Sequence, residues 1–224
     1  RKQLEELPPL LTGTRVERVF CKGKHIFVAF DNGVYLHNHL VMRGRWRKIK
    51  GRLLMLPEGT WLALYVGAHT VCNLNGQMLK MTDWGGVQAA MDSLGPDIMA
   101  EPFPRQAVTE AIAASRLPVA EAILDQSVVC GVGNIAKSEA LLRARIDPRA
   151  SASRLDGPSL RRLVQVLHDL LWESYHQGGR WTCRVYRKRG QPCPDCGHKI
   201  QLLRLAPSKR STYFCPACQG SGGA

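Results

Sequence analysis

The chain has 224 residues, with 31 Lys or Arg against 18 Asp or Glu, which gives a net charge of +13 at pH 7 with histidine neutral. A hydrophobic content of 45% supports a sizeable core, so a disordered chain and a miniprotein scaffold are both excluded, and the length suits one or two domains. No apolar run approaches the ~18 to 20 residues of a membrane span, and the first residues lack a signal-peptide apolar region. We therefore expect a soluble, intracellular protein with no membrane partner and, from its charge, a polyanionic partner.

The first part of the chain predicts a β-sandwich or barrel-like domain. Its short segments are rich in β-branched and aromatic residues, and Asp31-Asn32-Gly33 and Pro57-Glu58-Gly59 are turn signals between them. The expected strands are residues 16–20, 26–30, 34–37, 45–49, 53–56, 61–66 and 70–74.

From about Leu94 the pattern changes to that of helices. The expected helices are residues 106–115, 119–125, 135–143 and 159–175. The last is the clearest, because its leucines and valine recur at helical spacing: Leu160, Leu163, Val164, Leu167 and Leu171. The expected domains are a β-sandwich over 1–93, a linker over 94–104, a helical domain over 105–182, and a zinc finger with its tail over 183–224.

Four of the eight cysteines form two C-x-x-C pairs near the end of the chain, Cys193 with Cys196 and Cys215 with Cys218. Two such pairs can supply four thiolates to one structural Zn²⁺ in tetrahedral geometry. Disulfides are the alternative, and nothing else in the sequence indicates an oxidising compartment. We expect that replacing Cys215 with Ala releases zinc.

The segment between the second and third expected helices ends in Gly131-Val132-Gly133-Asn134. It resembles a tight helix–turn–helix junction, and a helix beginning at Asn134 would direct unpaired N–H groups toward a phosphate. Asn134 could equally cap its own helix, and the sequence leaves both roles open.

Four further features invite a functional interpretation beside a structural one. Residues 200–205 and 211–214 are expected to form a hairpin whose tip carries Arg210, which suits either a phosphate contact or a solvated turn. Lys24 lies in a basic turn and is by composition a solvated residue, whereas Met42 by the same argument is a packing residue. His37 and His39 share one face of a strand and could titrate or bind metal, although such a pair is usually structural.

In chain order, these segments resemble the formamidopyrimidine-DNA glycosylase / endonuclease VIII family. The ending Arg210-Ser211-Thr212-Tyr213-Phe214-Cys215-Pro216-Ala217-Cys218-Gln219 is the most distinctive match. It follows Lys22-Gly23-Lys24, His39-Leu40-Val41-Met42-Arg43-Gly44, Leu94-Gly95-Pro96-Asp97, Leu124-Asp125-Gln126 and Gly131-Val132-Gly133-Asn134.

The resemblance implies an α+β fold. An N-terminal β-sandwich domain would be joined to a C-terminal helical domain with a helix–two-turn–helix and a zinc-finger β-hairpin, and duplex DNA would bind between them. It also implies a role for each matched residue. Lys24 takes the place of a lysine that contacts phosphates at the lesion and assists catalysis. Asn134 and Arg210 take the places of phosphate-binding residues. Met42 takes the place of a residue that fills the gap left by the extruded nucleotide.

The implied activity is that of a bifunctional DNA glycosylase and AP lyase acting on oxidised-base or abasic-site duplex. A secondary amine would attack C1′ of the flipped nucleotide, and the Schiff base would lead to β- and δ-elimination. The implied protein is a monomer with one structural Zn²⁺, cytoplasmic and nucleoid-associated in a bacterium or nuclear in a eukaryote.

The first residues depart from the family pattern, in which an N-terminal proline nucleophile is followed directly by a catalytic glutamate. This chain begins Arg1-Lys2-Gln3-Leu4-Glu5-Glu6, and Pro8 and Pro9 cannot replace the nucleophile because an internal proline nitrogen is an amide. We expect the proline to lie upstream of Arg1 in the intact protein. Two alternatives stay open: a damaged-DNA-binding protein without catalysis, and a zinc-ribbon module for RNA or for a protein complex.

Overall fold

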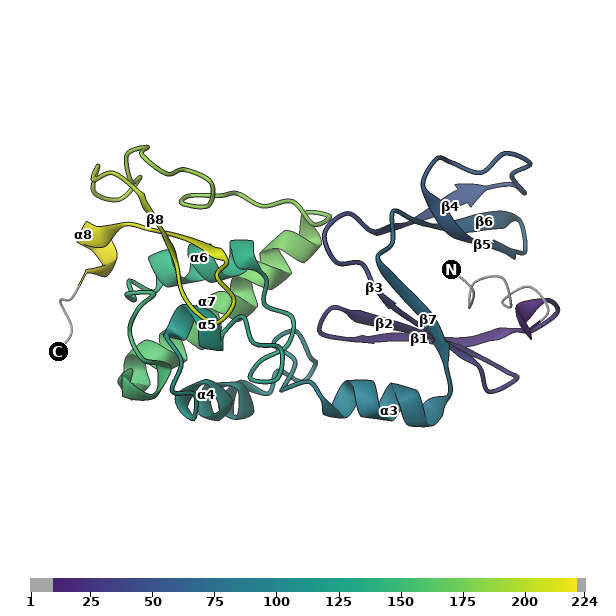
Figure 1. Cartoon of the computed structure of the whole chain (residues 1–224), viewed down its shortest axis with the longest axis horizontal. Helices are drawn as coiled ribbons and strands as arrows, with labels where there is room; N and C mark the ends of the chain where they lie inside the picture. The colour runs from purple at the N-terminus through teal and green to yellow at the C-terminus, as the bar shows by residue number, and fades with distance from the viewer. Residues whose placement is uncertain (1–9, 221–224) are drawn as a thin grey trace. The chain divides into compact units, whose positions relative to one another are not determined.

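The chain folds into two units that divide between Asp92 and Ser93, and each is described here by itself (Figure 1). The computed structural model describes residues 10–220. The predictions about a missing nucleophile concern the first nine residues, which lie outside this range, as do the last four residues of the expected tail.

The first unit is a sandwich of two antiparallel sheets, as the sequence predicts. One sheet has the order β1-β2-β3-β7 and the other the order β4-β6-β5. Buried Val28, Phe30 and Leu36 of the first sheet pack against Leu62 and Leu64 of the second, which forms the core between them. The strands are β1 (Val16–Lys22), β2 (His25–Phe30), β3 (Tyr35–His39), β4 (Arg45–Lys50), β5 (Thr60–Val66), β6 (His69–Leu74) and β7 (Met78–Thr82).

One expected strand, residues 53–56, is wrong. Strands β4 and β5 both pair with β6, which lies between them. The segment that connects β4 to β5 therefore crosses over to the other side of β6 and pairs with no strand. Leu54 is 100% exposed and Met55 is 89% exposed, so the apolar character of the segment reflects no burial. The predicted turn after it is present, with the Thr60 N–H donating to the Pro57 carbonyl at 3.2 Å.

The first unit also contains two elements that the sequence did not predict. Strand β7 is only five residues long, with Leu79 buried and Lys80 exposed, and is held by its pairing with β3. Helix α3 (Trp84–Asp92) begins with two helix-disfavouring glycines, Gly85 and Gly86. The carboxylate of Asp83 stabilises this first turn by accepting the Gly86 N–H at 2.8 Å.

The second unit is built around α7, whose predicted apolar stripe is confirmed. All five of its predicted positions are buried in one core with residues of α4 and α6. Asp156 caps the helix by accepting the Ser159 N–H at 2.6 Å. The helices are α4 (Arg105–Ala113), α5 (Val119–Ala122), α6 (Asn134–Arg143), the short 3₁₀ turn η1 (Ala152–Arg154) and α7 (Gly157–His176).

The residues before α4 pack closely onto the junction between α5 and α6. Gly95 donates its N–H to the Gln126 carbonyl at 2.9 Å, and Ile98 donates to the Cys130 carbonyl at 3.2 Å. A Cβ on Gly95 would lie 2.5 Å from the Val128 carbonyl oxygen, so only glycine permits this approach. Thus the Gly95-Pro96 signal marks a packed segment of the second unit.

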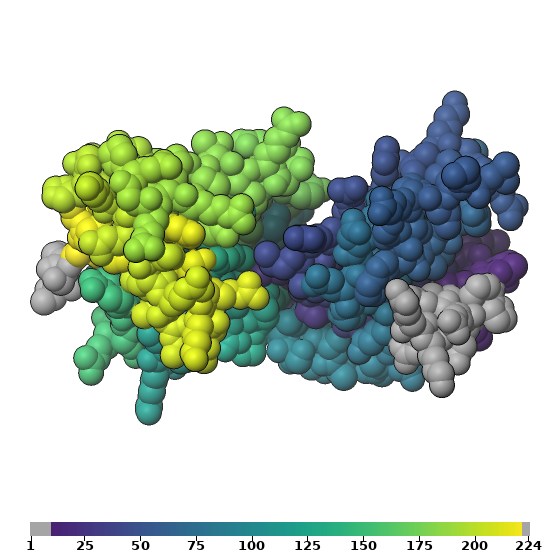
Figure 2. Space-filling view, turned by 45° about the horizontal axis from the view of Figure 1, so that its top comes forward, coloured from purple at the N-terminus to yellow at the C-terminus, as the bar shows by residue number. Residues whose placement is uncertain are grey.

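The chain ends in a small zinc-finger module. It contains β8 (Gln201–Arg204), β9 (Ser211–Phe214) and the short α8 (Pro216–Gln219), and the predicted hairpin is confirmed by pairing from Gln201 with Phe214 to Arg204 with Ser211. In Figure 2 this yellow-green to yellow module lies over the green helices of the same unit. Across the residues described, the helices are all too short or too polar to span a membrane.

Candidate functional site

Lys24 lies in the two-residue turn between β1 and β2, directly after Gly23. Strand pairing closes at Lys22 with His25, and Gly23 adopts φ +56°, a conformation that favours glycine in a tight hairpin turn. Burial lowers the pKa of both His25 and His39, and the charge of Lys24 lowers each of them further. Lys24 is therefore placed at the end of the sheet where β2 and β3 meet.

Met42 lies at this same end of the sheet, in the turn that follows β3. His39 pairs with His25 in register, and its Nδ1 accepts the Val41 N–H at 3.0 Å. The Met42 side chain is 74% exposed. The expectation of a packing residue is thus wrong, and the side chain is accessible for contact with another molecule.

A histidine cluster lies beneath these two turns. The Nδ1 of His25 and the Nε2 of His37 are 2.7 Å apart and share a hydrogen bond, and the His25 and His39 rings lie 4.9 Å apart. Burial lowers the pKa of His37 to about 4, assisted by the charges of His25, Lys80 and His39. These imidazoles are therefore neutral at neutral pH. They do not form a metal cluster: within residues 10–220, the only group of side chains placed to hold a metal ion is the set of four cysteines.

Asn134 is the first residue of α6 and does not cap it. The N-cap is Gly133, with no side-chain cap hydrogen bond. Instead, Asn134 Nδ2 donates to the Ser211 carbonyl at 3.0 Å, on the first residue of β9. Of the two roles left open by the sequence, capping is excluded, and the side chain ties the N-terminus of α6 to the zinc hairpin.

The tip of the zinc hairpin carries Arg210, which is exposed. Glu121 of α5 is only 2% exposed and accepts both the N–H of Ser208 at 2.8 Å and its hydroxyl at 2.9 Å. The Ser208 Oγ in turn accepts the Arg210 N–H at 3.2 Å. Asn134 and Arg210 therefore meet at this hairpin, because Asn134 bonds to Ser211, the neighbour of Arg210, across 77 positions of the chain.

Lys137, one turn along α6 from Asn134, is completely buried. Its Nζ donates to the same Ser211 carbonyl at 3.2 Å. Burial lowers the pKa of the Lys137 ammonium to about 8, an effect that the Glu121 carboxylate opposes and the Arg210 charge reinforces. Glu121 and Lys137 were not predicted from the sequence, and the one available signal was the single charged residue among the apolar residues of Val119–Ala122.

A second buried carboxylate, Glu139 of α6, anchors the start of the zinc-finger segment. It accepts the backbone N–H groups of Arg184, Val185 and Tyr186 at 2.9, 3.0 and 2.8 Å. Such charge-assisted bonds are stronger than neutral ones, so this segment is fixed on the helix. Gln219 fastens the other end of the module, donating to the Ile146 carbonyl at 2.9 Å.

The four cysteines lie together as their spacing predicts. Their sulfur atoms are all within 4.8 Å of one another, with 3.9 Å between Cys193 and Cys218 and 3.4 Å between Cys196 and Cys215. Tetrahedral Zn²⁺ with Zn–S bonds of about 2.3 Å places sulfurs about 3.8 Å apart, so the cluster fits the ion. This Cys₄ set binds a structural zinc, because all four coordination positions would be filled by protein.

Two family models match the second unit. Residues 94–184 match the formamidopyrimidine-DNA glycosylase H2TH domain, and residues 190–220 match the zinc finger found in FPG and IleRS. The first range contains Asn134, and the second contains the four cysteines and Arg210.

Curated relatives extend the similarity over nearly all of the chain. A formamidopyrimidine-DNA glycosylase of Paracoccus denitrificans is 32% identical over 245 aligned residues, which cover 95% of this chain and 87% of the relative. The DNA-(apurinic or apyrimidinic site) lyase Nei2 of Mycolicibacterium smegmatis is also 32% identical, covering 93% and 84% of the two chains.

Solved structures show the same fold. A MutM structure in complex with DNA containing carbocyclic 8-oxo-G is 25% identical with a TM-score of 0.83, and covers 97% of this chain and 86% of its own. The Lactococcus lactis Fpg in complex with abasic-site DNA has the same TM-score and coverage at 24% identity, a similarity of fold.

Proposed function

Because the chain belongs to the formamidopyrimidine-DNA glycosylase / endonuclease VIII family, we propose that it is a bifunctional DNA glycosylase and AP lyase of base excision repair. It binds duplex DNA, extrudes an oxidised base, excises it and nicks the strand at the resulting abasic site. Flipping is needed because the target atom cannot be reached inside the base stack.

The observation that carries this proposal is the hydrogen-bonded assembly of the α6 N-terminus and the zinc hairpin. Asn134 and Ser211 join the two elements, and Arg210 lies exposed beside them. The N-terminus of α6 carries partial positive charge and Arg210 a full one, so both favour a DNA phosphate.

Lys24 and Met42 have proposed roles at the lesion. Lys24 contacts the phosphates around it and assists the lyase step, and Met42, exposed on its turn, fills the space vacated by the extruded nucleotide. Their common position at one end of the β1-β2-β3-β7 sheet supports a shared task.

The proposed chemistry begins when a secondary amine attacks C1′ of the flipped nucleotide, and the glycosidic bond breaks as the base departs. The resulting Schiff base acidifies the C2′ proton, whose removal expels the 3′ phosphate, and a second elimination expels the 5′ phosphate. The family's amine is an N-terminal proline, so the native N-terminal sequence is part of the test.

The partner is double-stranded DNA with an oxidised base or an abasic site, and a monomer suffices to bind one duplex. The two curated relatives described above are bacterial, and we propose a nucleoid-associated location on the same basis.

Borohydride trapping tests the activity. The native protein, with its first residues determined by N-terminal sequencing, is incubated with abasic-site and oxidised-base duplexes in the presence of borohydride. We expect a covalent protein–DNA adduct, because borohydride reduces the Schiff base to a stable amine, and strand cleavage when borohydride is omitted.

The variant Lys24→Ala should cleave the abasic strand more slowly even when the DNA is saturated with protein, whereas the matched control Lys80→Ala should cleave at the native rate. Binding of abasic duplex by the native protein without adduct or cleavage would instead identify a damaged-DNA-binding protein. Preference for RNA over lesion duplex would contradict DNA repair altogether.

A further inference from the structure

Glu121 is a buried carboxylate that the sequence pattern and the matched family motifs leave without a role. It lies on α5 with 2% of its surface exposed, among the apolar residues Val119, Ala120 and Ala122. A carboxylate in such surroundings is costly unless it is bonded and its charge is balanced. Its partners therefore indicate what the residue does.

The partners of Glu121 lie on the tip of the zinc hairpin, 87 positions along the chain. One oxygen accepts the Ser208 hydroxyl at 2.9 Å and the other accepts the Ser208 N–H at 2.8 Å. Because that hydroxyl proton is directed to Glu121, a lone pair on Ser208 Oγ is available for the Arg210 N–H, which it accepts at 3.2 Å. The carboxylate thus acts on the Arg210 backbone through one intervening side chain.

Lys137 balances the charge of this assembly. It is fully buried, and its ammonium interacts favourably with the Glu121 carboxylate. Its Nζ and the Asn134 Nδ2 both donate to the carbonyl of Ser211, the residue that follows Arg210. The backbone of Arg210 is consequently held on one side through Ser208 and on the other through Ser211.

We propose that Glu121 is a positioning residue that holds the backbone of Arg210 in its DNA-binding conformation through the hydroxyl of Ser208. The inference rests on the proposed function in one respect, that Arg210 contacts a DNA phosphate. An arginine on an exposed turn otherwise loses conformational freedom when it binds, and a turn ordered beforehand reduces that loss.

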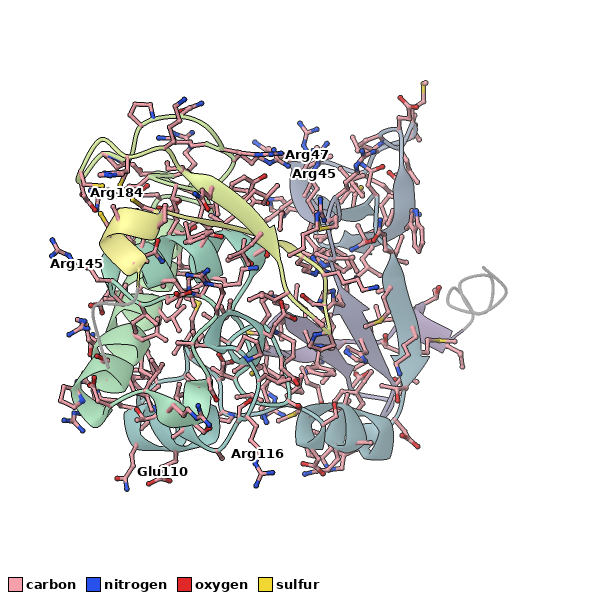
Figure 3. All side chains as sticks on the ribbon, turned by 60° about the vertical axis from the view of Figure 1, so that its left-hand side comes forward. Arg45, Arg47, Glu110, Arg116, Arg145 and Arg184 are labelled. Atoms are coloured by element: carbon pink, nitrogen blue, oxygen red, sulfur yellow. The ribbon has the colours of Figure 1, made fainter. Side chains whose placement is uncertain are left out.

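The first test concerns the free protein and requires no DNA. In Glu121→Gln, only one of the two terminal atoms is an acceptor and the other is an NH2 donor, so the side chain cannot accept the Ser208 N–H on one atom and the Ser208 hydroxyl on the other. The Ser208 and Arg210 N–H groups should therefore exchange with solvent about tenfold faster than in the native chain. Glu110→Gln is the matched control, because Glu110 is exposed on α4 and points away from the unit in Figure 3. Unchanged exchange at both amides in Glu121→Gln would overturn the proposal.

The second test measures affinity for a duplex with a tetrahydrofuran abasic-site analogue. Glu121→Gln and Ser208→Ala should each weaken binding about fivefold to tenfold, the latter factor being about 1.4 kcal/mol. Both substitutions break the same series of hydrogen bonds from Glu121 to Arg210. The affinity of the double variant for the duplex should therefore be no lower than that of the single variant with the lower affinity. Additive losses, or full affinity despite faster exchange, would overturn the positioning role.

Two measurements separate positioning from general damage. Zinc content should stay at the native level, and the single-turnover cleavage rate at saturating abasic duplex should stay within about twofold, because Arg210 positioning affects binding. Ser208→Ala, an exposed substitution, keeps the test possible if Glu121→Gln folds poorly. Failure of the native protein to bind abasic duplex would reject the proposed function, while the exchange test would still decide whether Glu121 orders Arg210.

Discussion

Burial controls the ionisation of individual side chains in both units. His37 in the first unit and Lys137 in the second are almost or completely buried, and in each the charged form is disfavoured because it is removed from water. Neighbouring charges then act on the two pKa values in different ways. Positive groups surround His37 and depress its pKa further, whereas the Glu121 carboxylate partly restores that of Lys137.

The depressed pKa of His37 predicts a pH dependence of stability. The folded value is about 4 and the ordinary value 6.5, so below pH 6.5 the unfolded chain binds a proton that the folded chain resists. The stabilisation is complete above pH 6.5 and is lost as the pH falls toward 4, by about 2 to 3 kcal/mol. Urea unfolding of the full chain at these two pH values measures the loss.

The substitution His37→Phe should reduce this pH dependence, because phenylalanine keeps the ring against Phe27, at 4.5 Å, and cannot be protonated. His69→Gln, on β6, serves as the control and should leave the slope nearly unchanged. An equal slope in His37→Phe and the native chain would refute the assignment to His37.

Among the elements, the zinc hairpin depends most directly on a ligand. Cys215 is fully buried at the base of β9 and supplies one of four sulfurs, and zinc binding in such modules is also folding free energy. We expect Cys215→Ala to lose its stoichiometric zinc and to disorder the hairpin tip. Metal analysis measures the first effect, and trypsin cleavage after Lys209 or Arg210 measures the second.

Cys21→Ser is the matched control, since Cys21 is an exposed residue of β1 outside the cluster. It should retain native zinc content and native resistance to trypsin. Stoichiometric zinc in Cys215→Ala would mean that the four-cysteine assignment is wrong.

For the whole molecule, the net charge of +13 predicts DNA binding that weakens steeply with salt. Each neutralised phosphate releases condensed counterions, so removing one contact should reduce the slope of log K against log salt by about 0.9. We expect this reduction for Arg210→Ala in fluorescence titrations of abasic-analogue duplex over a salt series.

Arg116→Ala removes the same charge from an exposed position between α4 and α5 that points to solvent in Figure 3. The slope depends on the number of phosphates that are contacted, so a variant that removes a cation without a phosphate contact should keep the native slope. Equal slopes for both variants would argue against a phosphate contact by Arg210.

Local patterns were sufficient to predict most of the fold. Five buried apolar residues at helical spacing define the core face of α7, and the Asp31-Asn32-Gly33 turn closes the β2–β3 hairpin. Two C-x-x-C pairs predict the zinc cluster because thiolate number and spacing suffice for tetrahedral coordination. The wrong strand at 53–56 and the unpredicted β7 have one cause: a strand exists only where a neighbour accepts its hydrogen bonds, and sequence does not show neighbours.

The sequence by itself determined the α+β class, the zinc ligands, the family resemblance and the identity of Asn134, Arg210, Lys24 and Met42 as candidates. Only the tertiary structure decided what Asn134 does with its side chain, that Met42 is exposed, and that Glu121, Lys137 and Ser208 belong with Arg210. The physical reason is distance along the chain. A buried carboxylate 87 positions from its serine leaves no periodic trace, because long-range polar pairing depends on how packed elements bring the two groups together.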